Sequence, residues 1–120
     1  MNKISFSRAN DLVRKGALLA DVRDPVAYRD GHIDGAVNLP LRNFVNAIMG
    51  LTDKNKSVII YSDTLDDVSL KQSHVYAMNL GFGNVYVATY ATLKEELQYQ
   101  APAPYKKPYQ KSSKVKKKGP

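Results

Sequence analysis

The sequence predicts an α/β sandwich built on a mainly parallel sheet. Apolar runs of strand length alternate with helix-length segments through the first 100 residues, as expected of strand–helix–strand units. The run at 17–22 is almost continuously apolar, which is typical of a strand that is covered on both faces. A chain of 120 residues with 43% hydrophobic and 24% charged residues suits one globular domain.

A short strand at Ile4 and a capped helix are expected at the start of the chain. Ser5 or Ser7 can cap this helix, and Gly16 suits the position just beyond its end. The strand at 17–22 follows, and we expect it near the centre of the sheet. The apolar positions of the helix share one face: Phe6, Ala9, Leu12 and Val13.

Two helices and a brief strand are expected next. Asp24 is a favourable N-cap and Pro25 is favourable at the first helical position, so a short helix is predicted over 25–30. A brief extended segment at 36–39 precedes a second helix, predicted over 40–50 with a glycine at its end. The inward positions of this second helix are Leu41, Phe44, Val45, Ile48 and Met49.

In the second half of the domain, the sequence predicts a buried strand at 57–61, then a loop, and then a helix that ends at Gly81. A fifth strand is expected at 85–87, and Thr92 can cap a last helix that turns Leu93 and Leu97 inward. The inward face of the helix before Gly81 is less regular than the others. Its positions are Ser73, Tyr76, Ala77 and Leu80, with Val68 and Val75 alongside.

Residues 101–120 differ from the rest of the chain. They hold seven of the 18 basic residues and no acid, which leaves 11 basic and 11 acidic residues in 1–100. We therefore expect a neutral domain over 1–100 and a disordered, lysine- and proline-rich tail over 101–120. The tail could contact nucleic acid or another polyanion through its charge and through Tyr105 and Tyr109. A solvated extension is the favoured interpretation.

Neither a membrane segment nor a signal peptide is evident. No apolar run approaches the roughly 18 residues that a membrane-spanning helix needs, so we expect a cytoplasmic protein. The chain has no cysteine, and this excludes disulfides, thiolate metal sites and cysteine nucleophiles together.

The loop after the strand at 57–61 is the expected position for chemistry. Ligands of parallel sheets bind beyond the carboxyl ends of the strands, and the N-terminus of a helix favours anions. Arg23 and Arg42 follow neighbouring strands, so both are binding candidates together with Ser62. The loop has no glycine or arginine and consists of Ser62, Asp63, Thr64, Leu65, Asp66 and Asp67.

The three aspartates of this loop allow two interpretations. Clustered carboxylates could bind a divalent cation. The favoured interpretation is that Asp66 or Asp67 caps the following helix while the other carboxylates are solvated. We therefore expect neither a metal ion nor a cofactor. An aspartyl nucleophile of the phosphatase kind is rejected, because the second aspartate it would need is replaced by Leu65.

Two linked motifs precede the loop: DVRDP at 21–25 and GHIDGAVNLP at 31–40. Three shorter segments follow, namely VIIY at 58–61, LGF at 80–82 and NVY at 84–86. In this order they resemble the signatures of single-domain rhodanese-like proteins, a sulfurtransferase family, over about residues 4–98. The resemblance implies a three-layer sandwich, in which a five-stranded, mainly parallel sheet lies between helices on both faces.

The resemblance also implies which residue would carry the chemistry. In active members the residue after this strand is a cysteine that accepts a sulfane sulfur, and Ser62 stands in its place. A serine hydroxyl cannot form a persulfide and titrates far above neutral pH. The loop is two residues longer than the family pattern and acidic where the family has glycine and arginine. Paired glycines of the family correspond to Tyr90 and Ala91.

The remaining motif residues are expected to support the structure. Asp21 and Arg23 would brace the strand end and the loop by hydrogen bonds, although either could contact a ligand. His32 and Gly35 lie in the segment that shapes a turn in this family. His32 could act as a general base by composition, but that role requires partner geometry.

We therefore expect a catalytically inactive rhodanese-like domain that acts as a binding or regulatory module, with another protein as its partner. One alternative is an enzyme with residual or altered chemistry on the acidic loop, related to sulfur transfer or assisted by a cation. A second alternative is an interaction protein that works through its basic tail.

Overall fold

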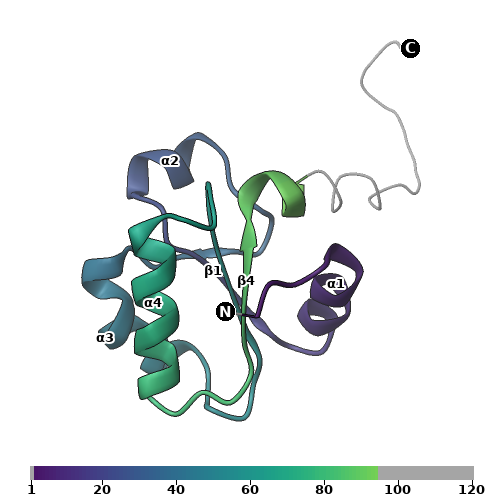
Figure 1. The fold of residues 1–120 in the computed structure, drawn as a ribbon, viewed down its shortest axis with the longest axis vertical. Helices are drawn as coiled ribbons and strands as arrows, with labels where there is room; N and C mark the ends of the chain where they lie inside the picture. The colour runs from purple at the N-terminus through teal and green to yellow at the C-terminus, as the bar shows by residue number, and fades with distance from the viewer. Residues whose placement is uncertain (1, 95–120) are drawn as a thin grey trace.

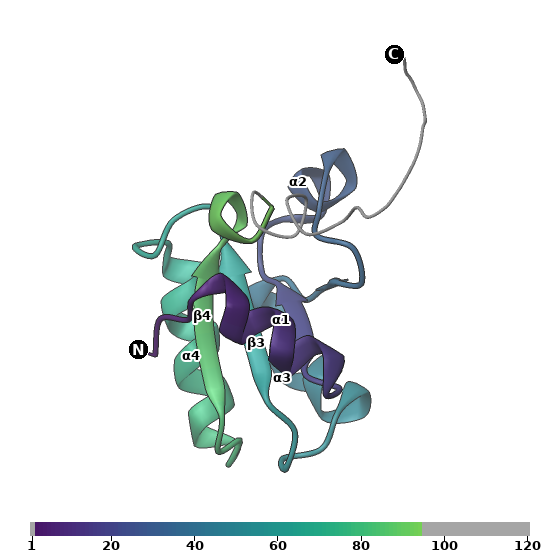
Figure 2. The same cartoon turned by 90° about the vertical axis from the view of Figure 1, so that its right-hand side faces the viewer.

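The computed structural model describes residues 2–94, apart from the side chain of Phe6, and these residues form three layers (Figure 1). A parallel sheet lies between α1 (Phe6–Arg14) on one face and α3 (Leu41–Leu51) with α4 (Val68–Asn79) on the other. Figure 2 shows α1 in front of the sheet and α4 behind it. The short α2 (Pro25–Asp30) lies beyond the carboxyl end of the sheet. The predicted α/β sandwich is confirmed.

The sheet has four strands within residues 2–94, in the order β2-β1-β3-β4, and all neighbours are parallel. The predicted strand at Ile4 forms only an isolated bridge, in which Lys3 pairs with Val87 beside β4. Too few residues run alongside β4 there to form a ladder. The strands are β1 (Leu18–Asp21), β2 (Val37–Asn38), β3 (Val58–Ser62) and β4 (Val85–Thr89).

Local capping explains where α1 and α2 begin. The Ser5 side chain accepts a hydrogen bond from the Arg8 N–H at the start of α1. Asp24 accepts from the N–H groups of Val26 and Ala27 at the start of α2, as predicted.

None of the helices within residues 2–94 is long and apolar enough to cross a membrane.

The predicted inward face of α3 is partly wrong. Phe44 and Ile48 are fully buried, but Val45 and Met49 are 37% and 48% exposed. Each exposed residue follows a buried one by a single position, and one position turns a helix by about 100°. The helix also continues through Gly50 to Leu51, because a glycine weakens a helix without having to end it.

Two further helix predictions need correction. Val68 and Val75 of α4 are exposed, since the buried stripe of this helix is formed by Leu70, Ser73 and Ala77. The last helix begins at Tyr90, and Thr89 caps it by accepting a hydrogen bond from the Thr92 N–H at 3.2 Å. The predicted position of Leu97 and the tail at 101–120 lie outside the described residues.

The strand β3 lies at the centre of the core. Every residue of β3 is fully buried, as expected for a strand that is covered on both faces. Val58 and Ile60 pack with the α3 and α4 layer, whereas Ile59 and Tyr61 pack with the α1 layer. This fixes the position of Ser62 at the carboxyl end of the strand.

Candidate functional site at the carboxyl ends of β1 and β3

A buried ion pair lies at the carboxyl end of β1. Arg23 Nη2 donates to the Asp21 carboxylate at 2.7 Å, and Arg23 Nε donates to the same group at 3.1 Å. The two residues are only 7% and 0% exposed. The hydrogen bonds to Asp21 raise the pKa of Arg23 above its ordinary value. Nη2 also donates to the Gly31 carbonyl at 2.7 Å, so this arginine ties the strand end to the turn after α2.

The same strand end is tied to β2. The amide of Asn38 donates to the backbone carbonyls of Asp21 and Arg23 at 3.0 Å. The Leu39 N–H donates to the Asp21 carbonyl at 2.8 Å. Residues of both motifs, DVRDP at 21–25 and GHIDGAVNLP at 31–40, therefore belong to one buried hydrogen-bond network, in which each donor has an acceptor.

Two tyrosine rings lie against Arg23. The guanidinium carbon is 4.1 Å from the ring centroid of Tyr90 and 5.6 Å from that of Tyr61. The rings stack with centroids 5.9 Å apart. The Tyr90 hydroxyl oxygen lies 3.0 Å from where a Cβ on Gly31 would stand, so Tyr90 fills the space beside the turn. The Arg23 guanidinium is thus occupied by a carboxylate, a carbonyl and two rings.

Tyr61 has a second contact that the sequence did not indicate. Its hydroxyl oxygen accepts a hydrogen bond from the Ile33 N–H at 3.1 Å. Burial, together with the Asp21 carboxylate, raises the pKa of Tyr61 above its ordinary value, so the hydroxyl stays protonated at neutral pH. In the sequence Tyr61 is only the last residue of an apolar strand, and no local signal marks its partner.

Ser62 is the last residue of β3, and its side chain is fully buried. Its hydroxyl donates a hydrogen bond to the Asp67 carboxylate. The other oxygen of Asp67 accepts from the Ser69 N–H at 3.1 Å and caps α4. Of the two predicted caps, the structure assigns Asp67. The loop therefore closes on itself, with a carboxylate of the chain at the N-terminus of α4.

The other carboxylates of the loop have separate partners. Asp63 lies 3.5 Å from Arg23 Nη1 and is 65% exposed. Asp66 lies 3.8 Å from Lys71 and is 98% exposed. Within residues 2–94 no three side chains of a metal-ligating kind are grouped so that they could hold an ion. Thr64 and Leu65 turn the loop, and Leu65 packs against the core.

The remaining candidates lie apart from Ser62. Arg42 is on the first turn of α3 and lines a groove between α3 and α4. His32 stacks on Tyr28 with ring centroids 3.7 Å apart, and its Nδ1 lies 2.7 Å from the Tyr28 carbonyl. Gly35 has a φ of +85°, which favours glycine, in the turn before β2. The structure thus brings Arg23 to the loop, but not Arg42.

Comparisons with known proteins give a family match. A model of the rhodanese-like domain matches residues 5–90. The chain is 34% identical over 85 residues to the thiosulfate sulfurtransferase GlpE of Pseudomonas entomophila, covering 70% of this chain and 74% of that protein. It is 29% identical over 82 residues to the tRNA uridine(34) hydroxylase of Buchnera aphidicola, covering 64% of this chain. The chain spans only 26% of that hydroxylase.

Solved structures show the same fold. The Alr3790 protein from Anabaena sp. superposes with a TM-score of 0.65 at 24% identity, covering 77% of this chain and 85% of that one. A rhodanese with anions from E. coli superposes with a TM-score of 0.58 at 25% identity, covering 64% of this chain and 91% of that one.

Proposed function

The chain belongs to the rhodanese-like domain family, and we propose that it is a member without sulfurtransferase activity that acts as a binding or regulatory module. Sulfur transfer through a persulfide requires a thiolate that forms an S–S bond. The sequence contains no cysteine. At the position that the family motif assigns to the nucleophile, the chain has Ser62.

The observation that carries this proposal is the hydrogen bond between Ser62 and Asp67. A helix N-terminus at the end of a strand is where a substrate anion would be stabilised by N–H groups. Here the Asp67 carboxylate takes that position, and it also holds the buried Ser62 hydroxyl. A nucleophile must reach its substrate, so a fully buried hydroxyl that is held by a carboxylate is unsuited to the role.

The surrounding charges also disfavour an anionic substrate. The side chains of Asp63 and Asp66 are exposed on the loop between β3 and α4. One carboxylate about 5 Å from an anion, at an effective dielectric constant near 20, costs roughly 3 kcal/mol. Of the cations next to the loop, Lys71 is paired with Asp66, and the donors of Arg23 are already directed at Asp21, Gly31 and Asp63. A thiosulfate ion would therefore meet carboxylates and an occupied guanidinium.

The two alternatives receive less support. Altered chemistry on the loop would need an accessible reactive group, whereas Ser62 is buried and Asp67 is engaged as a helix cap. The tail that would bind a polyanion lies outside the described residues. We therefore retain the binding role, with another protein as the partner and the cytoplasm as the proposed location.

A thiosulfate-to-cyanide sulfur transfer assay tests the loss of activity. The full-length protein is expected to give no thiocyanate above the buffer rate, while a GlpE-type relative serves as the positive control. Ser62→Cys is expected to remain far less active than that control, because Asp63, Asp66 and Asp67 still repel the anion. Turnover by the wild-type protein that Ser62→Ala abolishes would overturn the proposal.

A further inference from the structure

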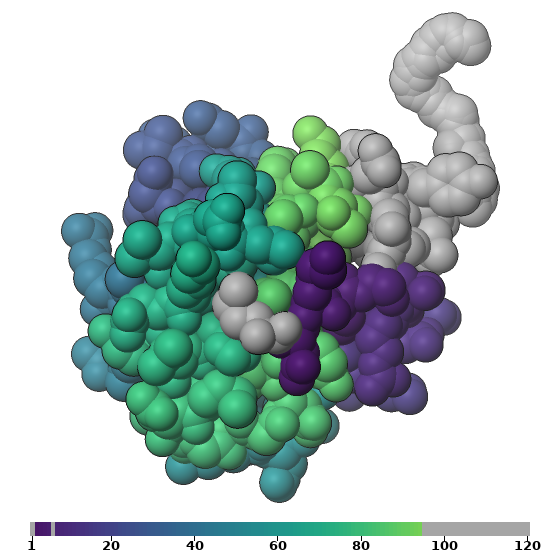
Figure 3. Space-filling view, viewed as in Figure 1, coloured from purple at the N-terminus to yellow at the C-terminus, as the bar shows by residue number. Residues whose placement is uncertain are grey.

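A groove between α3 and α4 is not used by the site described above. It has a volume of about 620 Å³, within the range of ligand and peptide pockets, and it opens beside the start of α2. Figure 3 shows the surfaces of α2, α3 and α4 meeting on the left of the molecule. Its walls are largely apolar and include Val22, Pro25, Pro40, Leu41 and Val45.

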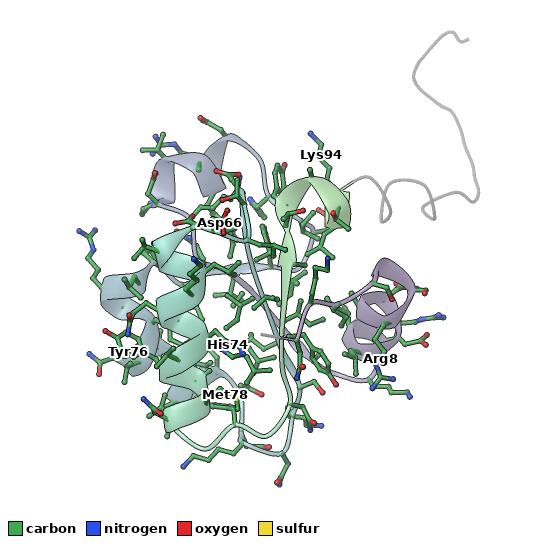
Figure 4. All side chains as sticks on the ribbon, in the orientation of Figure 1. Arg8, Asp66, His74, Tyr76, Met78 and Lys94 are labelled. Atoms are coloured by element: carbon green, nitrogen blue, oxygen red, sulfur yellow. The ribbon has the colours of Figure 1, made fainter. Side chains whose placement is uncertain are left out.

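Exposed apolar side chains continue the groove along α3. Val45 is 37% exposed, and Met49, one helical turn further on, is 48% exposed. Tyr76 forms the facing wall on α4, and Figure 4 shows it on the side of α4 that faces α3. The inner stripe of α3, formed by Phe44 and Ile48, already contacts the core. Val45 and Met49 are therefore additional apolar surface outside the core, of the kind that marks interaction sites.

The charges at the groove indicate the chemistry of its partner. Neither α3 nor α4 contains an acidic residue. Arg42 lines the groove and takes part in no ion pair among residues 2–94. Asp24 is the acid that lines the groove, but its carboxylate is engaged by the N–H groups at the start of α2. Because Arg42 has no carboxylate partner among residues 2–94, the groove favours a partner that places a carboxylate beside it.

The basic tail at 101–120 is a poor match for the groove. Lys94, the last described residue, lies on the α1 side of the sheet, where it lines a cavity together with Ala9 and Val13 of α1. The seven lysines of the tail would also be repelled by Arg42. A second copy in a two-fold dimer would present the same face, and the acid that lines it, Asp24, already accepts hydrogen bonds from the start of α2.

We propose that this groove binds an amphipathic helical segment of another protein, with apolar side chains against Leu41 and Val45 and a carboxylate beside Arg42. The inference rests on the proposed binding role and names the face that performs it. Recognition would follow the helix-in-groove mode, in which apolar anchors one turn apart fill the groove and a charge fixes their orientation.

The test uses the full-length protein and three labelled peptides of about 14 residues, roughly four helical turns. The first has leucines on one helical face and glutamates elsewhere. The second has the same composition in scrambled order, and the third has lysines in place of the glutamates. Binding is measured by fluorescence anisotropy, and the contact face is mapped from the methyl NMR signals of Val45 and Met49, with Val75 and Met78 as controls.

We expect the first peptide to bind at least about tenfold more tightly than the other two. Val45→Asp and Arg42→Glu should each weaken it by about tenfold or more, and Arg42→Glu should improve binding of the lysine peptide. Val75→Asp, at an exposed position on the outer side of α4, is the matched control and should bind as the wild type does. Circular dichroism verifies that all three variants are folded.

Three outcomes would overturn the inference. The first is equal binding of the three peptides, and the second is an equal effect of Val45→Asp and Val75→Asp. The third is a dimer in sedimentation that Val45→Asp dissociates, because the occupant would then be a second copy. None of these outcomes changes the sulfur transfer assay, so failure here is distinguishable from failure of the proposed loss of activity.

Discussion

The carboxyl ends of β1 and β3 are neighbours in the sheet, yet they differ in what they hold. Asp21 pairs in register with Tyr61, so the two ends lie side by side. The β1 end has the family motif and a buried, fully paired Asp21–Arg23 network. The β3 end has a serine, a carboxylate cap and exposed acids in place of a thiol and cations. The rhodanese-like scaffold is thus present with no cysteine on its loop.

The largest predicted effect is at the β1 end. Arg23→Leu should lower the free energy of unfolding by about 3–5 kcal/mol, because it leaves the buried Asp21 carboxylate without its partner. Urea denaturation measures this loss. Arg42→Leu removes an exposed arginine and should change stability by only about 0.5 kcal/mol. Similar effects of the two substitutions would mean that Arg23 does not brace the strand end.

The next effect is at the β3 end. Asp67→Ala should cost about 2–3 kcal/mol, because it removes the cap of α4 and leaves the buried Ser62 hydroxyl without an acceptor. Adding Ser62→Ala to this variant should restore part of the loss, since both partners of that hydrogen bond are then absent. A double variant that is less stable than Asp67→Ala would contradict the role of the pair.

Tyr61 links the β3 end to the turn at Ile33, and its substitution should have a smaller effect. Tyr61→Phe leaves the Ile33 N–H without its acceptor and should cost about 1–2 kcal/mol at neutral pH. Tyr86→Phe is the matched control, because the Tyr86 hydroxyl makes no hydrogen bond among residues 2–94. Equal unfolding midpoints in urea for the two variants would argue against the Tyr61 contact.

Tyr61 should also affect the alkaline limit of stability. Burial raises its pKa in the folded state, so the unfolded chain loses this proton first, at about pH 10. The stabilisation is therefore complete below about pH 10 and is lost as the pH rises further. Tyr61→Phe should make the fall in stability above pH 10 shallower, as measured by thermal unfolding. A slope equal to that of the wild type would contradict this assignment.

The smallest effect concerns His74 on α4. Burial lowers its pKa in the folded state, so its contribution is present above the unfolded value of about 6.5 and is lost as the pH falls. His74→Gln should flatten the dependence of stability on pH between about 7 and 5. Calorimetric unfolding at several pH values measures this slope. An unchanged slope would mean that His74 titrates alike in the folded and unfolded chains.

Elements with local signals were predicted well from the sequence. The start of α2 at Asp24 and Pro25 and the buried run of β1 follow from neighbouring residues alone. The failures have a physical cause in tertiary packing. Whether the segment at Ile4 forms a strand depends on how much of it reaches β4, and the exposure of Val45 depends on which stripe of α3 meets the sheet.

The candidate site shows the same division. The absence of a sulfur nucleophile and the acidic character of the loop follow from composition and motif position. The assignment of the α4 cap to Asp67, the enclosure of Arg23 by Tyr61 and Tyr90, and the burial of Ser62 do not. The contacts of Arg23 join side chains from different strand ends, and Arg23 and Tyr90 are far apart along the chain. The Asp67 contacts are local, but the path of the loop decides which of its aspartates reaches Ser62 and Ser69.

By itself, the sequence determined the family scaffold and the absence of a thiol, because motifs, caps and residue types are local properties of the chain. Only the tertiary structure decided which contacts the residues at this site make. The parallel register of β1, β3 and β4 sets which strand ends are neighbours, and hence that Tyr61 and Tyr90 lie against Arg23. The path of the loop after β3 brings the Asp67 carboxylate to Ser62 and to the start of α4.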